Sequence, residues 1–227
     1  MGTRIDYAAD VNLRGYRAGE GPTGLLVAPA FAGLRDFEME IADRYAARGF
    51  AVLGADYYGD GWVAADRAEA ATAMAALNGD RARLLSRTRA GVDLLRAAGC
   101  ARVAAMGFCF GGKAVLDLAR IGAVDAAVSM HGLYDRPDFE TGPMPPVLLC
   151  HGWTDPLADP AAFQGMCAEL EAHSSDWHAV ALGGTGHAFT NPANTGGDAN
   201  MSYVARSAGR AFAAADALLE GIGAPRD

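Results

Sequence analysis

The segment Gly107 to Gly112 (GFCFGG) has the residue types and spacing of a nucleophile held at a sharp turn. It follows the apolar run Arg102 to Met106 and precedes the helix-like stretch Lys113 to Arg120. Strand, Gly-x-Cys-x-Gly turn and helix make the layout of a nucleophile elbow. The N–H groups at a helix N-terminus stabilise negative charge, so the Cys109 thiol should form a thiolate more readily than a free cysteine. The alternative is a buried cysteine beside a Gly-rich turn, and partner residues decide between the two.

An acid and a histidine follow the elbow in the required order. Asp155 comes after the apolar run Pro146 to Cys150, and His187 lies in a Gly-rich loop after Trp177 to Leu182. Nucleophile, acid and histidine is the chain order of α/β-hydrolases. Because the carboxyl ends of parallel strands meet at one edge of a sheet, we expect these side chains to converge with Cys109.

This constellation predicts acyl transfer to water. Cys109 would attack an ester, lactone or thioester carbonyl, while His187 takes the thiol proton and returns it to the leaving group. Asp155 would hold the imidazole in the useful tautomer and stabilise its cation. The backbone N–H groups of Phe31 and Phe110 are expected to form the oxyanion hole. The mechanism needs no cofactor.

Other polar residues at strand ends have structural interpretations. Asp155 could instead cap the helix that starts near Pro160. We expect a structural role for His151, and for His131 a place near the pocket wall. The histidines and cysteines are too dispersed for the usual zinc spacing, so no metal site is expected.

Aromatic residues in the loops are candidates for lining the acyl pocket together with His131, and simple packing is the open alternative. These aromatic candidates are Tyr57, Tyr58, Trp62 and Trp153.

The elements that must position these residues alternate along the chain. Continuous apolar strands alternating with helices predict an α/β protein, with a mostly parallel sheet covered on both faces and little or no lid. We expect one domain spanning residues 1–227. A hairpin is predicted over 3–18, strands at 24–28, 50–55, 102–106, 124–130, 146–150 and 177–182, and helices at 36–48 (N-capped by Asp36), 64–77, 81–98, 113–120, 160–173 and 201–221.

Composition restricts the class of partner. The chain has 227 residues, half of them apolar, and a net charge of -8. A negative balance argues against nucleic acid and anionic membranes as partners. We expect no secretory signal and no membrane span, and we interpret the four scattered cysteines as reduced thiols in the cytoplasm.

The chain resembles the dienelactone hydrolase family of the α/β-hydrolase fold. The matching segments are residues 55–61 (ADYYGDG), 107–112 (GFCFGG), 151–156 (HGWTDP) and 186–192 (GHAFTNP). The resemblance implies a compact, cofactor-free, monomeric hydrolase of small acyl substrates. It also implies a Cys-His-Asp triad formed by Cys109, His187 and Asp155.

Two positions depart from the family pattern. The family commonly has an acidic residue that contacts the nucleophile, and Ala30 stands at that position here. Glu38 and Glu40 are expected to lie too far along the next helix to make this contact. The arginine that holds the substrate carboxylate in dienelactone-cleaving members is replaced by Asn191. We therefore predict a weak preference for anionic lactones, including dienelactone.

Two further hypotheses stay open. The fold could bind a ligand without catalysis, with Cys109 sensing oxidants or electrophiles, since the change at Ala30 could impair activation of the thiol. Alternatively, the acyl group could pass to an acceptor other than water, as in thioesterase or acyltransferase chemistry.

Overall fold

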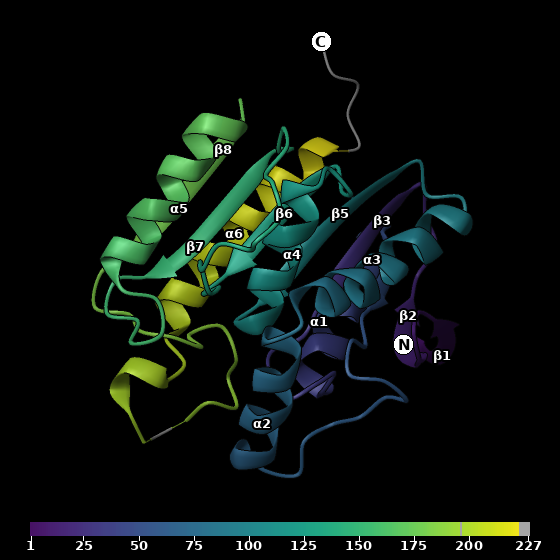
Figure 1. Ribbon diagram of the computed structural model, residues 1–227, viewed down its shortest axis with the longest axis horizontal. Coiled ribbons are helices and arrows are strands. Elements are labelled where there is room, and N and C mark those ends of the chain that lie inside the picture. The colour runs from purple at the N-terminus through teal and green to yellow at the C-terminus, as the bar shows by residue number, and fades with distance from the viewer. Residues whose placement is uncertain (196, 223–227) are drawn as a thin grey trace.

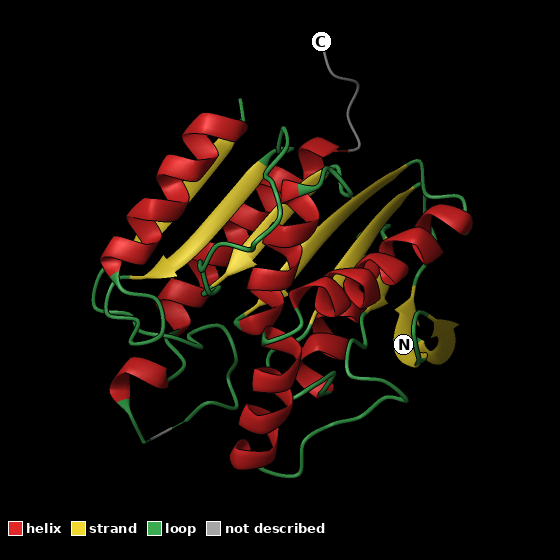
Figure 2. Ribbon diagram, viewed as in Figure 1, coloured by secondary structure: helices red, strands yellow, loops and turns green. Residues whose placement is uncertain are grey.

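A sheet of eight strands forms the centre of the protein (Figure 1, Figure 2). The computed structural model describes residues 1–195 and 197–222. The strand order is β1-β2-β4-β3-β5-β6-β7-β8. The strands are β1 (Thr3–Ala8), β2 (Asn12–Ala18), β3 (Thr23–Ala28), β4 (Ala51–Gly54), β5 (Arg102–Phe108), β6 (Ala126–Met130), β7 (Val147–Gly152) and β8 (Trp177–Leu182). β1 and β2 pair antiparallel, whereas β3 to β8 are parallel, so the predicted α/β class with a mostly parallel sheet is confirmed.

Helices cover both faces of this sheet. In Figure 1, α3, α4 and α5 lie in front of the strands and α6 lies behind them. The helices are α1 (Asp36–Ala46), α2 (Arg67–Asn78), α3 (Arg81–Ala97), α4 (Phe110–Arg120), α5 (Pro160–His173) and α6 (Ala205–Ile222), with a short 3-10 helix at Ala199–Met201. Within the described part of the chain, no helix combines the length and the apolar composition that crossing a membrane requires.

Alternation of side chains along β3 divides the core into two layers. Leu26 and Ala28 pack in the layer with α3, α4 and α5. Leu25 and Val27 pack in the opposite layer with α1 and α6. Because successive strand residues point to opposite faces, a continuous apolar run is what a strand covered on both sides requires.

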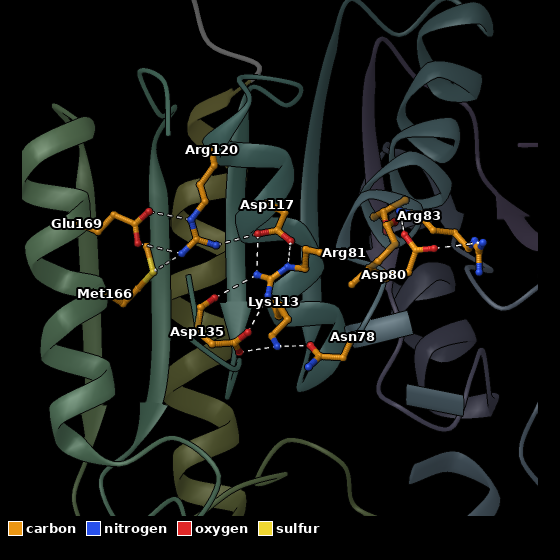
Figure 3. Close-up of polar contacts among 12 residues, drawn as sticks. Asn78, Asp80, Arg81, Arg83, Lys113, Asp117, Arg120, Asp135, Met166 and Glu169 are labelled. Atoms are coloured by element: carbon orange, nitrogen blue, oxygen red, sulfur yellow. Dashed lines mark hydrogen bonds and ion pairs between the residues drawn. The ribbon is translucent and has the colours of Figure 1, made fainter. Parts of the chain in front are cut away.

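A buried ion-pair network fixes α4 between α3 and α5 (Figure 3). The Arg120 side chain is fully buried, and its guanidinium lies 2.8 Å from carboxylate oxygens of both Asp117 and Glu169. Asp117 also accepts a hydrogen bond of 2.9 Å from Arg81 of α3. Buried charges are tolerated only when they are paired in this way. The network therefore holds in place the helix that follows the nucleophile elbow.

Three predicted helix starts and one predicted N-cap are wrong in detail. α2 begins at Arg67 rather than at Ala64, and α4 begins at Phe110 rather than at Lys113. Arg35, not Asp36, occupies the N-cap of α1, and Asp36 is the first helical residue. The C-terminal helix begins at Ala205 rather than at Met201. Asp198 caps the preceding 3-10 turn instead, accepting the Asn200 N–H at 2.8 Å. Short polar side chains near a helix start can stabilise alternative turns, which shifts the boundary.

Candidate active site

The elbow places Cys109 between the end of β5 and the start of α4. Its backbone has φ 54° and ψ -114°, a conformation that residues other than glycine rarely adopt. A Cβ at Gly107 would lie 2.1 Å from the Gly111 carbonyl oxygen, and a Cβ at Gly111 would lie 2.2 Å from that of Ala28. The Gly-x-Cys-x-Gly spacing is therefore required by the close approach of the backbone on both sides of the cysteine.

Asp155 and His187 form a buried hydrogen-bonded pair in the loops after β7 and β8. The distance from His187 Nδ1 to Asp155 Oδ2 is 2.7 Å. Asp155 Oδ1 accepts the N–H groups of Leu157 and Ala158 at 2.8 and 3.2 Å, which fixes the carboxylate. The His187 N–H donates to the Asn200 carbonyl at 2.6 Å. His187 Nε2 is buried and has no hydrogen-bond partner among the described residues, so it is available to a reacting group.

Opposing influences set the pKa of His187. Burial alone lowers this pKa, but the negative charge of Cys109 and the hydrogen bond to Asp155 outweigh burial and raise it to about 10. An opposite charge nearby favours the charged form of a titratable group. At neutral pH the His187 ring is therefore held in its charged, imidazolium form.

Glu38 also borders the cleft, and its expected separation from the nucleophile stays a prediction. Its side chain reaches back and accepts the N–H groups of Ala30 and Arg35, each at 3.2 Å. It is 4% exposed, and burial raises its pKa to about 7 against the effect of these hydrogen bonds. The missed signal was its place three residues after the N-cap, where a glutamate folds back on the turn before the helix.

A cleft of about 1350 Å³ contains Cys109, His187, His131 and Glu38. Most of its other walls are apolar, and charged side chains contribute the rest. The larger apolar side chains are Phe31, Leu34, Phe37, Met39, Val63, Met74, Phe108, Leu133, Leu157 and Met201, and the other charged ones are Arg4, Arg35, Asp36, Glu40, Asp66 and Arg67. Such a lining, with a few convergent polar groups, is typical of a small-molecule site. A second cavity, of about 250 Å³ beside Phe50 and Leu219, holds none of the candidate residues.

The two predicted oxyanion donors flank this region. Phe31 borders the cleft, and Phe110 is the first residue of α4, directly after Cys109. Neither backbone N–H has a hydrogen-bond acceptor among the described residues. Backbone N–H groups in the first turn of a helix have no partner within the helix, so the Phe110 N–H can donate to a bound anion.

The four aromatic candidates are not among the residues that border this cleft, so their place in an acyl pocket stays a prediction. They are Tyr57, Tyr58, Trp62 and Trp153. Tyr57 is fully buried and Trp153 is 42% exposed, its ring 6.4 Å from that of Phe163. The direction of a loop side chain depends on tertiary contacts, which the presence of an aromatic residue does not reveal.

The two remaining buried histidines have different surroundings. His131 borders the cleft, its ring lies 4.9 Å from that of His187, and its Nε2 lies 2.8 Å from Thr190 Oγ1. Burial and the charge of His187 lower the pKa of His131, so its ring stays neutral. His151 stacks on Phe163 at 4.4 Å, a packing contact. In the described ranges, no group of three or more His, Cys, Asp or Glu residues is arranged to hold a metal ion.

Comparison with known proteins identifies relatives over nearly the whole chain. The model of the dienelactone hydrolase family matches residues 14–222. A dienelactone hydrolase-like promiscuous phosphotriesterase from metagenomic libraries is 32% identical, with a TM-score of 0.88 and 98% of each chain covered. The solved structure m3DLH is 31% identical, with a TM-score of 0.87 and 98% of each chain covered. Thermogutta terrifontis esterase 2, phosphonylated by cyclosarin, shares the fold at 16% identity, with a TM-score of 0.70 over 99% of this chain and 96% of that one. No curated protein matches the chain.

Proposed function

Because the chain belongs to the dienelactone hydrolase family, we propose that it hydrolyses small carboxylic esters, lactones or thioesters through an acyl-cysteine intermediate. One observation carries the proposal. Cys109 lies at a strained elbow in the same cleft as His187, and the buried Asp155 orients the His187 ring. Nucleophile, base and orienting acid together are the parts that covalent acyl transfer requires.

In the acylation step, the Cys109 thiolate attacks the carbonyl carbon and forms the new C–S bond. The electron pair of the carbonyl moves to oxygen, and the N–H groups of Phe31 and Phe110 donate hydrogen bonds to this oxyanion. Loss of one such donor costs on the order of 3 kcal/mol of transition-state stabilisation. When the tetrahedral intermediate collapses, the bond to the leaving group breaks and His187 Nε2 gives that group its proton.

In the deacylation step, neutral His187 takes a proton from water as the oxygen attacks the thioester carbonyl. The C–S bond then breaks, the thiolate leaves and the carboxylic acid is released. Asp155 stabilises the imidazolium in both steps through its 2.7 Å hydrogen bond. The cycle therefore ends with the ion pair of thiolate and imidazolium with which it began.

The cleft favours neutral, apolar substrates. Asn191 borders the cleft at the position where the resemblance implies an arginine for the substrate carboxylate. The Asn191 side chain accepts the Ala193 N–H at 2.9 Å and carries no charge to pair with an anion. An apolar wall binds an acyl chain by removing it from water. We therefore propose neutral esters and thioesters as better substrates than anionic lactones.

A second candidate activity is phosphotriester hydrolysis. The metagenomic relative of 32% identity is a promiscuous phosphotriesterase. Cleavage would use the same thiolate, with attack at phosphorus in place of carbon and the same N–H groups facing the phosphoryl oxygen. Release of p-nitrophenol from a neutral phosphotriester such as paraoxon tests this candidate, and loss of release in Cys109→Ala is the expected result.

The primary proposal is tested by the hydrolysis of p-nitrophenyl acetate and of a short thioester. Wild type, Cys109→Ala, His187→Ala and the control Cys167→Ala are compared. Turnover should be lost in the first two variants and retained in Cys167→Ala, because Cys167 lies on α5 away from the cleft. Added alcohols or thiols show whether water is the acceptor. An inactive wild type in which iodoacetamide still alkylates Cys109 rapidly would favour the sensing hypothesis instead.

A further inference from the structure

Two neighbouring tyrosine hydroxyls hold the loop that carries one of the proposed oxyanion donors. Tyr57 Oη lies within donating distance of the Pro29 and Ala30 carbonyl oxygens, at 2.6 and 3.0 Å. Tyr58 Oη donates to the Phe31 carbonyl at 2.7 Å. Two hydroxyl donors therefore serve three consecutive carbonyl groups of this loop, with the single Tyr57 O–H shared between Pro29 and Ala30.

These contacts fix the direction of the Phe31 N–H. A trans peptide is planar, so the C=O of Ala30 and the N–H of Phe31 belong to one rigid unit and point in opposite directions. Tyr57 occupies the carbonyl side of that unit. Tyr58 fixes the next peptide plane, so the backbone is held on both sides of Phe31.

The same tyrosine pair contacts the segment that carries the second donor. The Tyr57 ring packs edge-on against the Phe110 ring, with the centroids 5.6 Å apart. It also packs against the Tyr58 ring at 4.9 Å. One aromatic unit therefore touches both the Phe31 loop and the first residue of α4, the two segments that carry the proposed donors.

Charged groups fix the tyrosines in turn. Arg87 Nη1 donates to the backbone carbonyls of Tyr57 and Tyr58 at 3.1 and 2.9 Å, and Asp10 pairs with the Arg87 guanidinium at 2.7 Å. The Asp56 carboxylate accepts the Tyr58 N–H at 2.9 Å. The rigid support that an oxyanion hole needs is therefore built from groups outside the cleft.

Both phenols stay protonated, and therefore stay donors, at any pH at which the enzyme would work. Burial raises the pKa of Tyr58, and the negative charge of Cys109 raises it further. The pKa of the fully buried Tyr57 is raised by the same two causes, with its neighbour Tyr58 contributing.

The geometry points to Tyr57 and Tyr58 as positioning residues that hold the Phe31 N–H in the oxyanion hole, a role that rests on the proposed hydrolase function. Neither residue is among those that line the cleft, and both hydroxyls are directed at backbone carbonyl groups. Their effect passes through the backbone of the loop. It should appear only in a reaction that develops negative charge on a substrate oxygen.

The test compares Tyr57→Phe and Tyr58→Phe with wild type in two reactions of Cys109. Hydrolysis of p-nitrophenyl acetate passes through an oxyanion, whereas alkylation by iodoacetamide displaces iodide at a saturated carbon and forms none. We expect kcat for hydrolysis to fall about tenfold or more in each single variant. In the double variant, the fall in kcat should approach the one caused by removal of a whole oxyanion-hole donor. KM and the alkylation rate should stay within about twofold of wild type, since binding and thiolate formation are unchanged.

Tyr16→Phe is the matched control. It removes a hydroxyl that donates a 2.9 Å hydrogen bond to the Asp43 carboxylate, and Tyr16 does not line the cleft. It should leave kcat unchanged. Wild-type kcat in both loop variants, or a loss of alkylation parallel to the loss of hydrolysis, would overturn the inference. Tyr58→Phe decides the matter if the more buried Tyr57→Phe fails to fold. An inactive wild type would refute the proposed function and the positioning role together. An active wild type whose tyrosine variants keep the wild-type kcat would refute the positioning role alone.

Discussion

At the scale of single residues, the site depends on buried charges that the fold keeps in pairs or holds by backbone N–H groups. The pKa of His187 rises to about 10 because the ring lies between Cys109 and Asp155. In the described residues, the Glu38 carboxylate accepts hydrogen bonds from backbone N–H groups, and burial raises its pKa to about 7. The imidazolium is thus stabilised by its neighbours, whereas the carboxylate is destabilised by its surroundings.

Glu38 should make the fold less stable as the pH rises. The folded protein retains a proton at Glu38 that the unfolded chain releases above its ordinary pKa of 4.5. This stabilisation is complete below the unfolded pKa and is lost as the pH rises through about 7. Between about pH 4 and about pH 8, the free energy of unfolding of wild type should fall by up to about 3 kcal/mol relative to Glu38→Gln. Urea denaturation at both pH values measures this difference, with the exposed Glu40→Gln as control. Parallel pH dependence in wild type and Glu38→Gln would contradict the assignment.

Asn191 should limit activity on anionic substrates. Asn191→Arg introduces a guanidinium that can pair with a substrate carboxylate, so the ratio of kcat/KM for an anionic ester to that for a neutral ester of equal length should rise about tenfold. Asn191→Gln keeps the site neutral and should leave the ratio unchanged. A wild type that already prefers the anionic ester, with a preference that weakens as salt is added, would refute this explanation of specificity.

At the scale of elements, the site residues lie where parallel strands end, and α4 joins the elbow to the rest of the fold. The ion pair of Arg120 with Glu169 connects α4 to α5, and the pairing of Arg81 with Asp117 connects α4 to α3 (Figure 3). A buried ion pair adds little net stability, but removal of one partner leaves an uncompensated charge.

Arg120→Leu should therefore destabilise the protein by about 3–5 kcal/mol, because Asp117 and Glu169 would remain buried with fewer partners. Arg14→Leu is the matched control. It breaks the exposed pair of Arg14 with Asp6, in which the two side chains are 49% and 55% exposed. The free energy of unfolding should therefore stay close to that of wild type. Urea denaturation measures both variants. Equal, small losses would show that the network contributes no more than a surface pair.

Sequence patterns predicted the elements well where local chemistry determines them. The glycines of the elbow, the continuous apolar strands and the Pro160–His173 helix, whose first residue is a proline, carry their structure in short segments. Two features could not be predicted. The Glu38 side chain folds back across a turn, and the hydroxyls of Tyr57 and Tyr58 face the backbone rather than the cleft, because packing between distant segments determines both directions.

At the scale of the whole molecule, few large apolar side chains of the described residues are exposed. The large ones in the described residues are Met1, Val63, Ile121, Trp153 and Leu157. Val63 and Leu157 border the cleft, where a substrate would cover them. Extensive protein interfaces normally need a larger contiguous apolar surface.

We therefore expect a monomer in solution. Light scattering coupled to size-exclusion chromatography should give the mass of one chain across a wide range of protein concentration. A stable dimer mass at low concentration would contradict this expectation. It would also direct attention to the sheet edges at β1 and β8 as pairing surfaces.

The central claim, covalent acyl transfer through Cys109, is tested most directly by mass spectrometry after rapid acid quenching. Wild type mixed with excess p-nitrophenyl acetate should carry one acetyl group on the peptide that contains Cys109. His187→Ala should form this adduct slowly, and Cys109→Ala should not form it. Turnover without any acyl adduct on Cys109, or an adduct on another residue with turnover retained in Cys109→Ala, would contradict the account.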